Sequence, residues 1–543
     1  MKMKTLKYLI STLLLATILY SCNDLELAPT NKFTEANYWT SAEKANLVLN
    51  MAYSQMYNND YFFKTEALSD NIYEGRGSSS EKVISSGMAD ASNGRFADEW
   101  KHCFEGIKTC HTLLENIDRV PQMDEKLKTR MVSEARFIRA WLFFRLTTWF
   151  GDVPLFDHDL TLSEAEHITR TPKNEVLAFI RKELEEIAIL LPTAAQYAAA
   201  DRGRVTSGAA IALNARTYLY ENDWSNVVTE TEKLINTNTY GTYTLFPSYA
   251  GIFLPANEYN NEVILDLQYV PVVKTWGNYF DLAPLSVGSR LNSMAPTQEL
   301  VDNYVMTNGK PIKEAGSGYD ENNPYNNRDP RLTATVVYHG YDWDKPDGSK
   351  KKIYIKPGTD PDAAHIDEYK GQGANATSTG YYLRKYYDPS SLTNFVSGLN
   401  FILIRYADIL LMYAEAKNEL NQMNAEVWNT TIKALRVRAG FTDGQALNFN
   451  AAWTQAELRN IIRQERRSEL AIEGLRIFDI RRWKTAETVL NDYPHGAKYG
   501  EPGVANGYIQ LEKRSFDPAR DYLWAVPQSQ KDLNPNLGQN PKW

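Results

Sequence analysis

The sequence predicts a mainly α-helical protein: a tetratricopeptide-like solenoid of helix pairs with a large irregular insertion that contains short β-strands. Apolar residues recur at three- and four-residue steps before residue 236 and again after residue 400. Small residues stand where neighbouring helices must approach each other closely. Between the two helical blocks the chain is rich in Tyr, Asn, Gly, Pro and Asp. No strict 34-residue period is visible, so the similarity to tetratricopeptide repeats lies in the helix pairing.

The first helical block covers about residues 40–236. Gly151 and Pro154 end its clearest helix, and the turn at 221–223 joins its last two helices into an αα-hairpin. The Ser- and Gly-rich stretch 75–94 is expected to be a loop. We expect helices at 40–56, 96–117, 125–150, 173–191, 207–220 and 224–235.

The irregular insertion covers about residues 237–399. Short apolar runs at 263–267, 333–338 and 352–355 are expected to form small strands. An insertion of this size in a helical scaffold is usually functional, because rigid elements position loops that carry binding sites.

The second helical block covers about residues 400–490, and an extended tail rich in Pro and Asn follows it. Helices are expected at 405–420, 425–439, 454–473 and 476–489. Acidic and basic residues alternate through 463–470 at helical spacing, which predicts that they pair with one another along the helix.

The N-terminus has the pattern of an exported lipoprotein. Lys2 and Lys4 precede a short apolar run, which is followed by Leu19-Tyr20-Ser21-Cys22. Residues 1–21 therefore read as a signal peptide, and the run is too short to span a bilayer. We expect acylation of Cys22, with several acyl chains giving stable attachment. An ordinary signal peptide or a core segment is the alternative.

Composition excludes several functional classes. The net charge is −8, and it becomes −11 without residues 1–21, which carry three lysines and no acidic residue. Such a chain is unsuited to nucleic acid or to electrostatic docking on anionic lipid. Cys103 and Cys110 lie two helical turns apart, too far for a disulfide, and are expected to be unpaired buried thiols.

No catalytic constellation is present in the sequence. The seven histidines form no H-E-x-x-H motif or Cys/His cluster, and no G-x-S-x-G elbow or phosphate loop occurs. The segment 342–348 resembles a calcium loop but lacks the closing Glu, so we expect a surface turn. We predict no enzyme activity and no cofactor.

Five segments together resemble one known family, the SusD/RagB outer-membrane lipoproteins of Bacteroidetes. Asp70-Asn71, the lipobox and 328–332 fit the same pattern, and the resemblance covers essentially the whole chain in order. The five segments are 134–141 continuing to 149–155, 203–210 continuing to 215–219, 405–416, 463–469 continuing to 474–479, and 522–527 with 534–541.

The resemblance implies a single SusD-like domain over 22–543 at the cell surface. It implies capture of oligosaccharides for a SusC-type TonB-dependent transporter, with the membrane reached only through the lipid anchor. It also implies that Arg136, Arg139 and Arg145 pair with acids inside the scaffold, and that the terminal segment packs back across the helices.

The candidate ligand contacts come from residue chemistry, because no ligand motif of the family transfers residue by residue. Aromatic rings stack on sugars while Asn, Asp and Arg bind hydroxyl groups, and aromatics in loops are better candidates than those in helices. Burial or loop anchoring is the alternative for each. The candidates are Tyr73, Arg76, Trp276, Tyr279, Tyr341 and Trp343.

Three further interpretations stay open from the sequence. The chain could be a peptide-binding member of the same family, a surface glycosidase or peptidase, or a transporter subunit that binds ligand only in the complex. Turnover of a substrate by the pure protein would favour the enzyme. A large protein interface without intrinsic affinity would favour the subunit.

Overall fold

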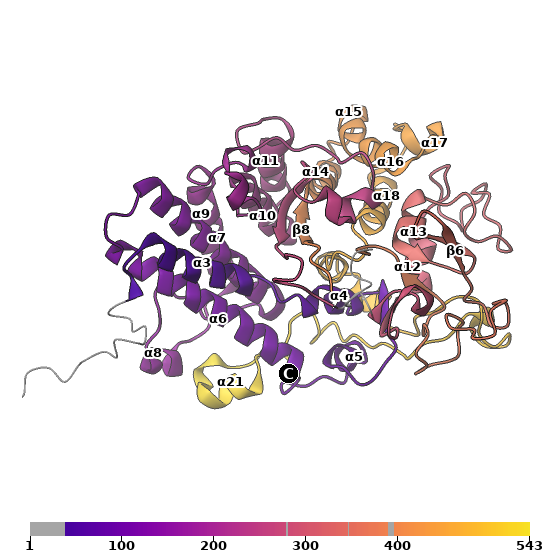
Figure 1. Ribbon diagram of the computed structural model, residues 1–543, viewed down its shortest axis with the longest axis horizontal. Helices are drawn as coiled ribbons and strands as arrows, with labels where there is room; N and C mark the ends of the chain where they lie inside the picture. The colour runs from indigo at the N-terminus through magenta and orange to yellow at the C-terminus, as the bar shows by residue number, and fades with distance from the viewer. Residues whose placement is uncertain (1–37, 278–280, 346, 389–395) are drawn as a thin grey trace, which may run out of the picture.

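The computed structural model describes residues 38–277, 281–345, 347–388 and 396–543, and it confirms the mainly helical fold class (Figure 1). The helices are α3 (Ala42–Gln55), α4 (Asp60–Ala67), α5 (Ser80–Ser85), α6 (Gly94–Asn116), α7 (Glu125–Phe150), α8 (Leu162–His167), α9 (Lys173–Ala188), α10 (Ser207–Tyr220), α11 (Trp224–Ile235), α12 (Gln298–Asn303), α13 (Pro330–Thr335), α14 (Tyr406–Glu419), α15 (Ala425–Trp428), α16 (Ala434–Ala439), α17 (Gly444–Leu447), α18 (Gln455–Glu469), α19 (Arg476–Arg482), α20 (Ala486–Val489) and α21 (Gln528–Leu533). The strands are β1 (Ile72–Glu74), β2 (Val263–Leu267), β3 (Met294–Pro296), β4 (Val336–Val337), β5 (Tyr341–Asp344), β6 (Lys350–Ile353), β7 (Tyr382–Leu383) and β8 (Phe401–Arg405).

The helices of both blocks form one continuous scaffold. In chain order α6 packs on α7, α7 on α9, α9 on α10 and α10 on α11. Helix α11 then packs on α14, which packs on α18, so the second block extends the first across the whole insertion (Figure 1). Close approach requires small residues: a Cβ atom on Gly106 of α6 would lie 2.5 Å from Cδ1 of Leu142 on α7.

Of four two-stranded antiparallel pairs in the described residues, two fasten the insertion to the scaffold and two lie within the insertion. β1 pairs with β3, β2 with β8, β4 with β7 and β5 with β6. The β2–β8 pair joins the start of the insertion to the start of the second helical block, and β1–β3 joins the insertion to the segment after α4. These two pairs anchor the insertion at different points along its length.

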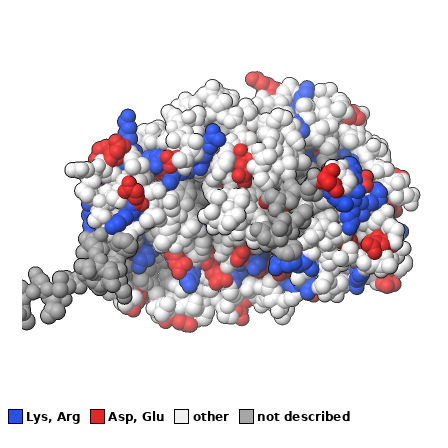
Figure 2. All heavy atoms as spheres, in the orientation of Figure 1, with Lys and Arg blue, Asp and Glu red and all other residues white. Residues whose placement is uncertain are grey.

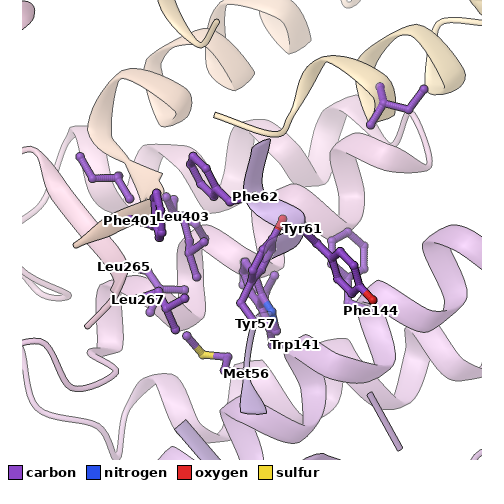
Figure 3. Packing of buried hydrophobic residues seen from close by; sticks show 14 of the residues in the cluster. Met56, Tyr57, Tyr61, Phe62, Trp141, Phe144, Leu265, Leu267, Phe401 and Leu403 are labelled. Carbon is purple, nitrogen blue, oxygen red and sulfur yellow. The ribbon is translucent and has the colours of Figure 1, made fainter. Parts of the chain in front are cut away.

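The core is continuous from the helices into the β2–β8 pair. Phe62 on α4 stacks on Phe401 of β8 with ring centroids 4.5 Å apart. Leu265 of β2 and Trp141 of α7 belong to the same buried cluster (Figure 3). This apolar contact holds the insertion against the first helical block.

Two expected elements of the chain are wrong in their type or extent. Residues 330–335 form helix α13, because Pro330 occupies its first position and the Asp329 side chain caps the backbone N–H of Arg331; only 336–337 are extended. The expected helix 476–489 breaks into α19 and α20, because Lys484 adopts a left-handed conformation with φ of 55°.

Smaller departures occur elsewhere. The expected loop 75–94 contains α5, whose start is capped by the Ser79 side chain. The expected helix 425–439 is interrupted by a π-helical turn at 429–433. The expected strand 263–267 is confirmed as β2, and the strand expected at 352–355 is β6, two residues earlier.

Helix α18 pairs its charges with other elements, so the expectation of pairing along the helix is wrong. Glu465 binds Arg331 and Arg436 at 2.7 and 2.8 Å. Arg466 binds Asp408 and Asp479 at 2.6 and 2.8 Å. These side chains are buried, so α18 acts as an ionic hub between the helical blocks and the insertion.

The expected pairing of the α7 arginines inside the scaffold is confirmed. Arg136 and Arg139 both bind Glu183 of α9, and Arg145 binds Glu99 of α6. Cys103 and Cys110 are both buried and free, as expected. Burial raises the pKa of the Cys110 thiol to about 12, so it stays protonated at neutral pH.

The C-terminal tail crosses the first helical block, as expected. Trp524 stacks on Trp149 of α7, with ring centroids 3.8 Å apart. The Asn540 side chain donates to the carbonyl oxygens of Phe150 and Trp524, each at 2.7 Å. In Figure 1 the tail helix α21 lies beside the early helices.

A helix crosses a bilayer only if it is long and apolar enough to span the hydrocarbon core. None of the helices in residues 38–277, 281–345, 347–388 and 396–543 is both long and apolar enough to cross a bilayer. On the face shown in Figure 2, acidic and basic side chains are interspersed. The signal peptide 1–21 and Cys22 lie outside the described residues.

Candidate functional site

Five half-buried tyrosines gather where the insertion meets the segment 495–511. We call them the tyrosine face: Tyr319, Tyr325, Tyr338, Tyr499 and Tyr508. Tyr325 stacks on Tyr338 with ring centroids 4.0 Å apart. Burial raises the pKa of Tyr499, and the interaction of its hydroxyl with the hydroxyl of Tyr325 raises that pKa further. Tyr319 and Tyr508 lie close enough to influence each other electrostatically.

Short elements of the insertion set the position of these rings. Tyr338 follows β4, and Tyr381 precedes its partner strand β7. The hydroxyl of Tyr381 donates to Oε1 of Gln298 at 2.6 Å, and Gln298 donates to Asp302 at 2.7 Å. The base of the site is thus a buried hydrogen-bonded row that starts on α12.

The segment 495–499 closes the other side of the site through very close backbone contact. The N–H of Ala497 donates to the carbonyl of Thr379 at 2.6 Å, and the N–H of Gln298 donates to the carbonyl of His495 at 2.8 Å. A Cβ atom on Gly496 would lie 2.3 Å from the Thr379 carbonyl oxygen. Only glycine allows this approach, which brings Tyr499 to the tyrosine face.

The electrostatics of the site favour neutral ligands. Burial raises the pKa of Tyr325 and of Tyr319 to about 12, so both hydroxyls remain protonated at neutral pH. Two charged pairs lie at the rim: His495 with Glu299 at 2.8 Å, and Lys498 with Glu321 at 2.6 Å. The buried Arg328 guanidinium, 5.6 Å from the Tyr319 ring, donates to backbone carbonyls. The hydrogen bond with Glu299 raises the pKa of His495.

This arrangement can bind a ligand that has both apolar and hydroxyl-rich surfaces. Half-exposed tyrosine rings offer apolar faces, and their hydroxyls donate and accept hydrogen bonds. No group of three or more His, Cys, Asp or Glu in the described part of the chain could hold a metal ion. Asp342 and Asp344 of the calcium-like segment lie on β5 and pair with Lys352 and Lys350.

Four of the candidate residues from the sequence are buried. Tyr73 is 4 % exposed, Trp276 2 %, Tyr341 8 % and Trp343 1 %. Tyr341 and Trp343 alternate with exposed residues along β5, so both face inward. The structure therefore favours burial, the other reading of these four residues, over a role as ligand contacts.

Their contacts show what they do instead. The indole N–H of Trp276 donates to the carbonyl of Leu399 at 2.7 Å, and its ring packs on Phe401. Trp343 lies against Arg384 and Tyr387. Trp276 thus anchors its loop to β8, and Trp343 ties β5 to residues 384–387 within the insertion; burial and loop anchoring were the alternative for these residues.

Arg76 differs because it is only half-buried. One guanidinium nitrogen donates to the carbonyl of Ala374 at 3.0 Å and to Oδ1 of Asn375 at 2.8 Å. It thereby ties the loop after β1 to the loop before β7. Arg290 and Asp281 form an exposed pair at 3.1 Å on the same side of the insertion. Arg76 remains a candidate, and Tyr279 lies outside the described residues.

The sequence reasoning missed the tyrosine face. Its members come from segments separated by up to about 190 residues, so spacing carries no signal. One local signal was available: Tyr325 sits within a run of asparagines and a proline, where an apolar ring has no helical or strand pattern to join.

A helical scaffold that presents an aromatic, hydroxyl-rich surface on its insertion defines a class of proteins in which rigid helices position ligand-binding loops. The chain belongs to the SusD family: the model described as "SusD family" matches residues 262–543. A second model, described as "starch-binding associating with outer membrane", matches residues 25–219.

Individual relatives agree over nearly the whole length. SusD-like protein P2 of Formosa agariphila is 26% identical over 98% of this chain and 99% of its own. A SusD-like carbohydrate-binding protein of Bacteroides fragilis is 31% identical, covers 92% of this chain and 99% of its own, and superposes with a TM-score of 0.82. Surface glycan-binding protein A of Bacteroides uniformis, 22% identical over 92% of this chain and 99% of its own, shows the same fold with a TM-score of 0.66.

Proposed function

We propose that this protein is a cell-surface lipoprotein that captures oligosaccharides or polysaccharide fragments and delivers them to a SusC-type TonB-dependent transporter. In this proposal residues 22–543 form one domain, Cys22 carries the lipid anchor in the outer membrane, and the protein performs no catalysis. The observation that carries the proposal is a neutral, hydroxyl-rich aromatic surface in a member of the SusD family.

The chemistry of the tyrosine face supports a sugar ligand. Sugar rings combine C–H faces with many hydroxyl groups, which suits half-exposed rings with protonated hydroxyls. Charged rim groups are paired with each other, so they do not demand a charged ligand. The name of the carbohydrate-binding relative of B. fragilis adds support for this ligand class.

The test is a binding and turnover assay on a panel of polysaccharides, oligosaccharides and peptides. We expect binding of at least one glycan without product formation. Tyr338→Ala and Tyr508→Ala should each weaken that binding by ~5- to 100-fold, the typical loss for removing a stacking ring. Tyr259→Ala is the matched control, because Tyr259 is 43% exposed and its hydroxyl contacts Gln268 away from the site.

Other outcomes would select among the alternatives. Binding of peptides alone would indicate a peptide-binding member, and product formation would indicate a hydrolase. Ligand binding only after copurification with the transporter would indicate a subunit without intrinsic affinity. Cys22→Ala should release the protein from membranes if the proposed anchor is correct.

A further inference from the structure

In addition to the tyrosine face, the protein has a cleft on the scaffold. It lies between the end of α7, the α10–α11 turn, the end of α19 and the C-terminal tail. Its volume is about 650 Å³, within the range of roughly 300–1,000 Å³ typical of small-ligand sites. Five basic side chains line it and only two acidic ones, Asp152 and Glu221. This excess of positive charge is notable in a chain whose net charge is −8.

Two of the basic side chains are neutralised within the protein. Lys173 binds Glu221 at 2.6 Å, and Arg482 is held by Glu415 and Asp479. The second acidic group, Asp152, accepts a hydrogen bond from the backbone N–H of Lys173 at 2.8 Å, at the start of α9. Its charge is therefore engaged at a helix N-terminus.

The other three basic side chains of the cleft form no ion pair in the part of the chain that the structure describes, although carboxylates lie nearby. They are Arg170 (near Asp152), Arg481 (near Asp521) and Lys484 (near Glu221 and Glu487). Arg170 donates to Oδ1 of Asn540 at 2.7 Å. Arg481 donates to the carbonyl of Tyr522, and its guanidinium lies 4.8 Å from the Trp149 ring. Neutral partners position both guanidinium groups, while Asp152 near Arg170 and Asp521 near Arg481 offset part of their charge without forming ion pairs.

Positive charges in the cleft repel the Lys484 ammonium, and Glu487 and Glu221 partly offset this repulsion. Burial lowers the pKa of Arg481 to about 10, although nearby Asp521 opposes the shift. Burial also lowers the pKa of Lys484, and Arg481 and Lys173 lower it further. An anion in the cleft would relieve this repulsion, and its solvation would be replaced by charge-assisted hydrogen bonds.

Lys484 provides an independent observation from the backbone. It adopts the left-handed conformation that ends α19, where its N–H bonds to the carbonyl of Arg481 and the next N–H bonds to Ile480. Glycine or asparagine is usual at this position because a Cβ atom is strained there. Here a lysine occupies it, and its ammonium lies 3.7 Å from the centre of the Tyr522 ring at the cleft.

We propose that this cleft binds the carboxylate or sulfate group of an acidic sugar, held by Arg170, Arg481 and Lys484. The anion-binding part depends only on the cleft. The sugar part rests on the proposed glycan-binding function, and it places an acidic residue of the glycan at a second site, separate from the neutral tyrosine face.

The first experiment compares an acidic glycan with its neutral form by titration calorimetry. A trisaccharide of galacturonic acid should bind ~10-fold more tightly than the same trisaccharide with its carboxylates reduced to alcohols. A sulfated oligosaccharide should behave like the acidic form, and added NaCl should weaken both. Equal affinities for the acidic and reduced trisaccharides would overturn the proposal.

The decisive variant is Lys484→Gly, which removes the charge at a position where glycine fits the backbone better. It should lower the affinity for the acidic trisaccharide ~10-fold without lowering the melting temperature. Lys126→Gln removes the same charge at the opposite end of α7 and should leave the affinity unchanged. Unchanged binding by a folded Lys484→Gly variant would contradict the assignment.

Further arms separate this proposal from the proposed function. Neutral glycan binding should persist in Lys484→Gly and be weakened in Tyr508→Ala. If inorganic sulfate binds as tightly as a sulfated sugar, the sugar part is overturned while the anion site stands. If the unmodified protein binds no neutral glycan at all, that result counts against the proposed function instead.

Discussion

At the scale of single residues, Arg405 at the end of β8 lies at the centre of a buried network of ion pairs. Its guanidinium binds Glu262 at 2.8 Å, Glu469 at 2.6 Å and Glu473 at 2.8 Å, all of them buried. Lys385 of the insertion joins through Glu473 at 2.7 Å, and burial lowers its pKa to about 8. These ion pairs hold the insertion against the second helical block.

Removing one carboxylate from this network of ion pairs should strongly destabilise the protein. Glu469 binds Arg331, Arg405 and Arg438, and these arginines hold its pKa well below the usual range despite burial. We expect Glu469→Gln to lower the free energy of unfolding by about 3–5 kcal/mol, because it leaves buried positive charge uncompensated. Urea unfolding measures this, with the exposed Glu105→Gln as a control expected within about 0.5 kcal/mol.

Asp266 of β2 gives a pH-dependent prediction, because its pKa is raised, whereas the pKa of Glu469 is lowered. Burial raises its pKa to about 7, although Gln268 and Asn400 donate hydrogen bonds to it. The stability that its protonated form provides is complete below about pH 4 and is lost as the pH rises towards 7.

Asp266→Asn should abolish this loss, because the amide stays neutral at every pH. The gain in unfolding free energy over the natural protein should grow between pH 4 and pH 8 to the order of 3 kcal/mol. Denaturant titrations at several pH values would measure it. A pH-independent difference would show that Asp266 is ionised in the native state.

At the scale of elements, the segment 495–499 couples backbone packing to the tyrosine face. Gly496 lies against the Thr379 carbonyl, and Gly380, with φ of 80°, lies against the Tyr499 ring. Both contacts depend on the absence of a side chain. The position of Tyr499 is therefore fixed by two glycines, one against its ring and one in the backbone before it.

Gly496→Ala should move this segment outward and disturb the site. Overpacking of this kind costs about 1–3 kcal/mol of stability, and the displaced Tyr499 should weaken glycan binding by several-fold. Gly503→Ala is a suitable control, since a Cβ atom there meets nothing within 4 Å. Equal binding by both variants would mean that Tyr499 does not contribute to the site.

Helices were the most predictable elements and the insertion the least. The expected limits of α7 and α10 are confirmed, because local residues set them: Asp124 and Thr206 cap their starts, and Gly151 ends α7. The inward rings of β5 did leave a local signal, because apolar and acidic residues alternate along 341–344, and this strand pairs with nearby β6. The break at Lys484 has no glycine or asparagine to mark it.

At the scale of the whole molecule, the described elements are tied together across the full length of the chain. The β2–β8 pair, the ion pairs of α18 and the contact of Trp524 with Trp149 each join distant parts. We predict that the protein unfolds in one cooperative thermal transition, and that Glu469→Gln shifts the whole transition. Scanning calorimetry checks this, and a separate early transition for the insertion would contradict it.

The fold class and the family resemblance could be read from the sequence, while the site could not. Helix periodicity and the order of the five segments depend on local residues. The tyrosine face assembles residues 319–338 with 499–508 through backbone contacts that only the folded chain shows. For loop aromatics such as Trp276, both ligand contact and burial stayed open, because sequence alone does not show which loops fold inward.

The stacking of Trp524 on Trp149 has a consequence for the order of events in synthesis. Helix α7 cannot cover its indole until the ribosome has added about 375 further residues, and Asp70 likewise waits for Arg467 and Arg476. These native contacts therefore form only after the last segment has emerged from the ribosome. Until then the Trp149 indole lacks its stacking partner, so the growing chain exposes apolar surface that the finished protein buries.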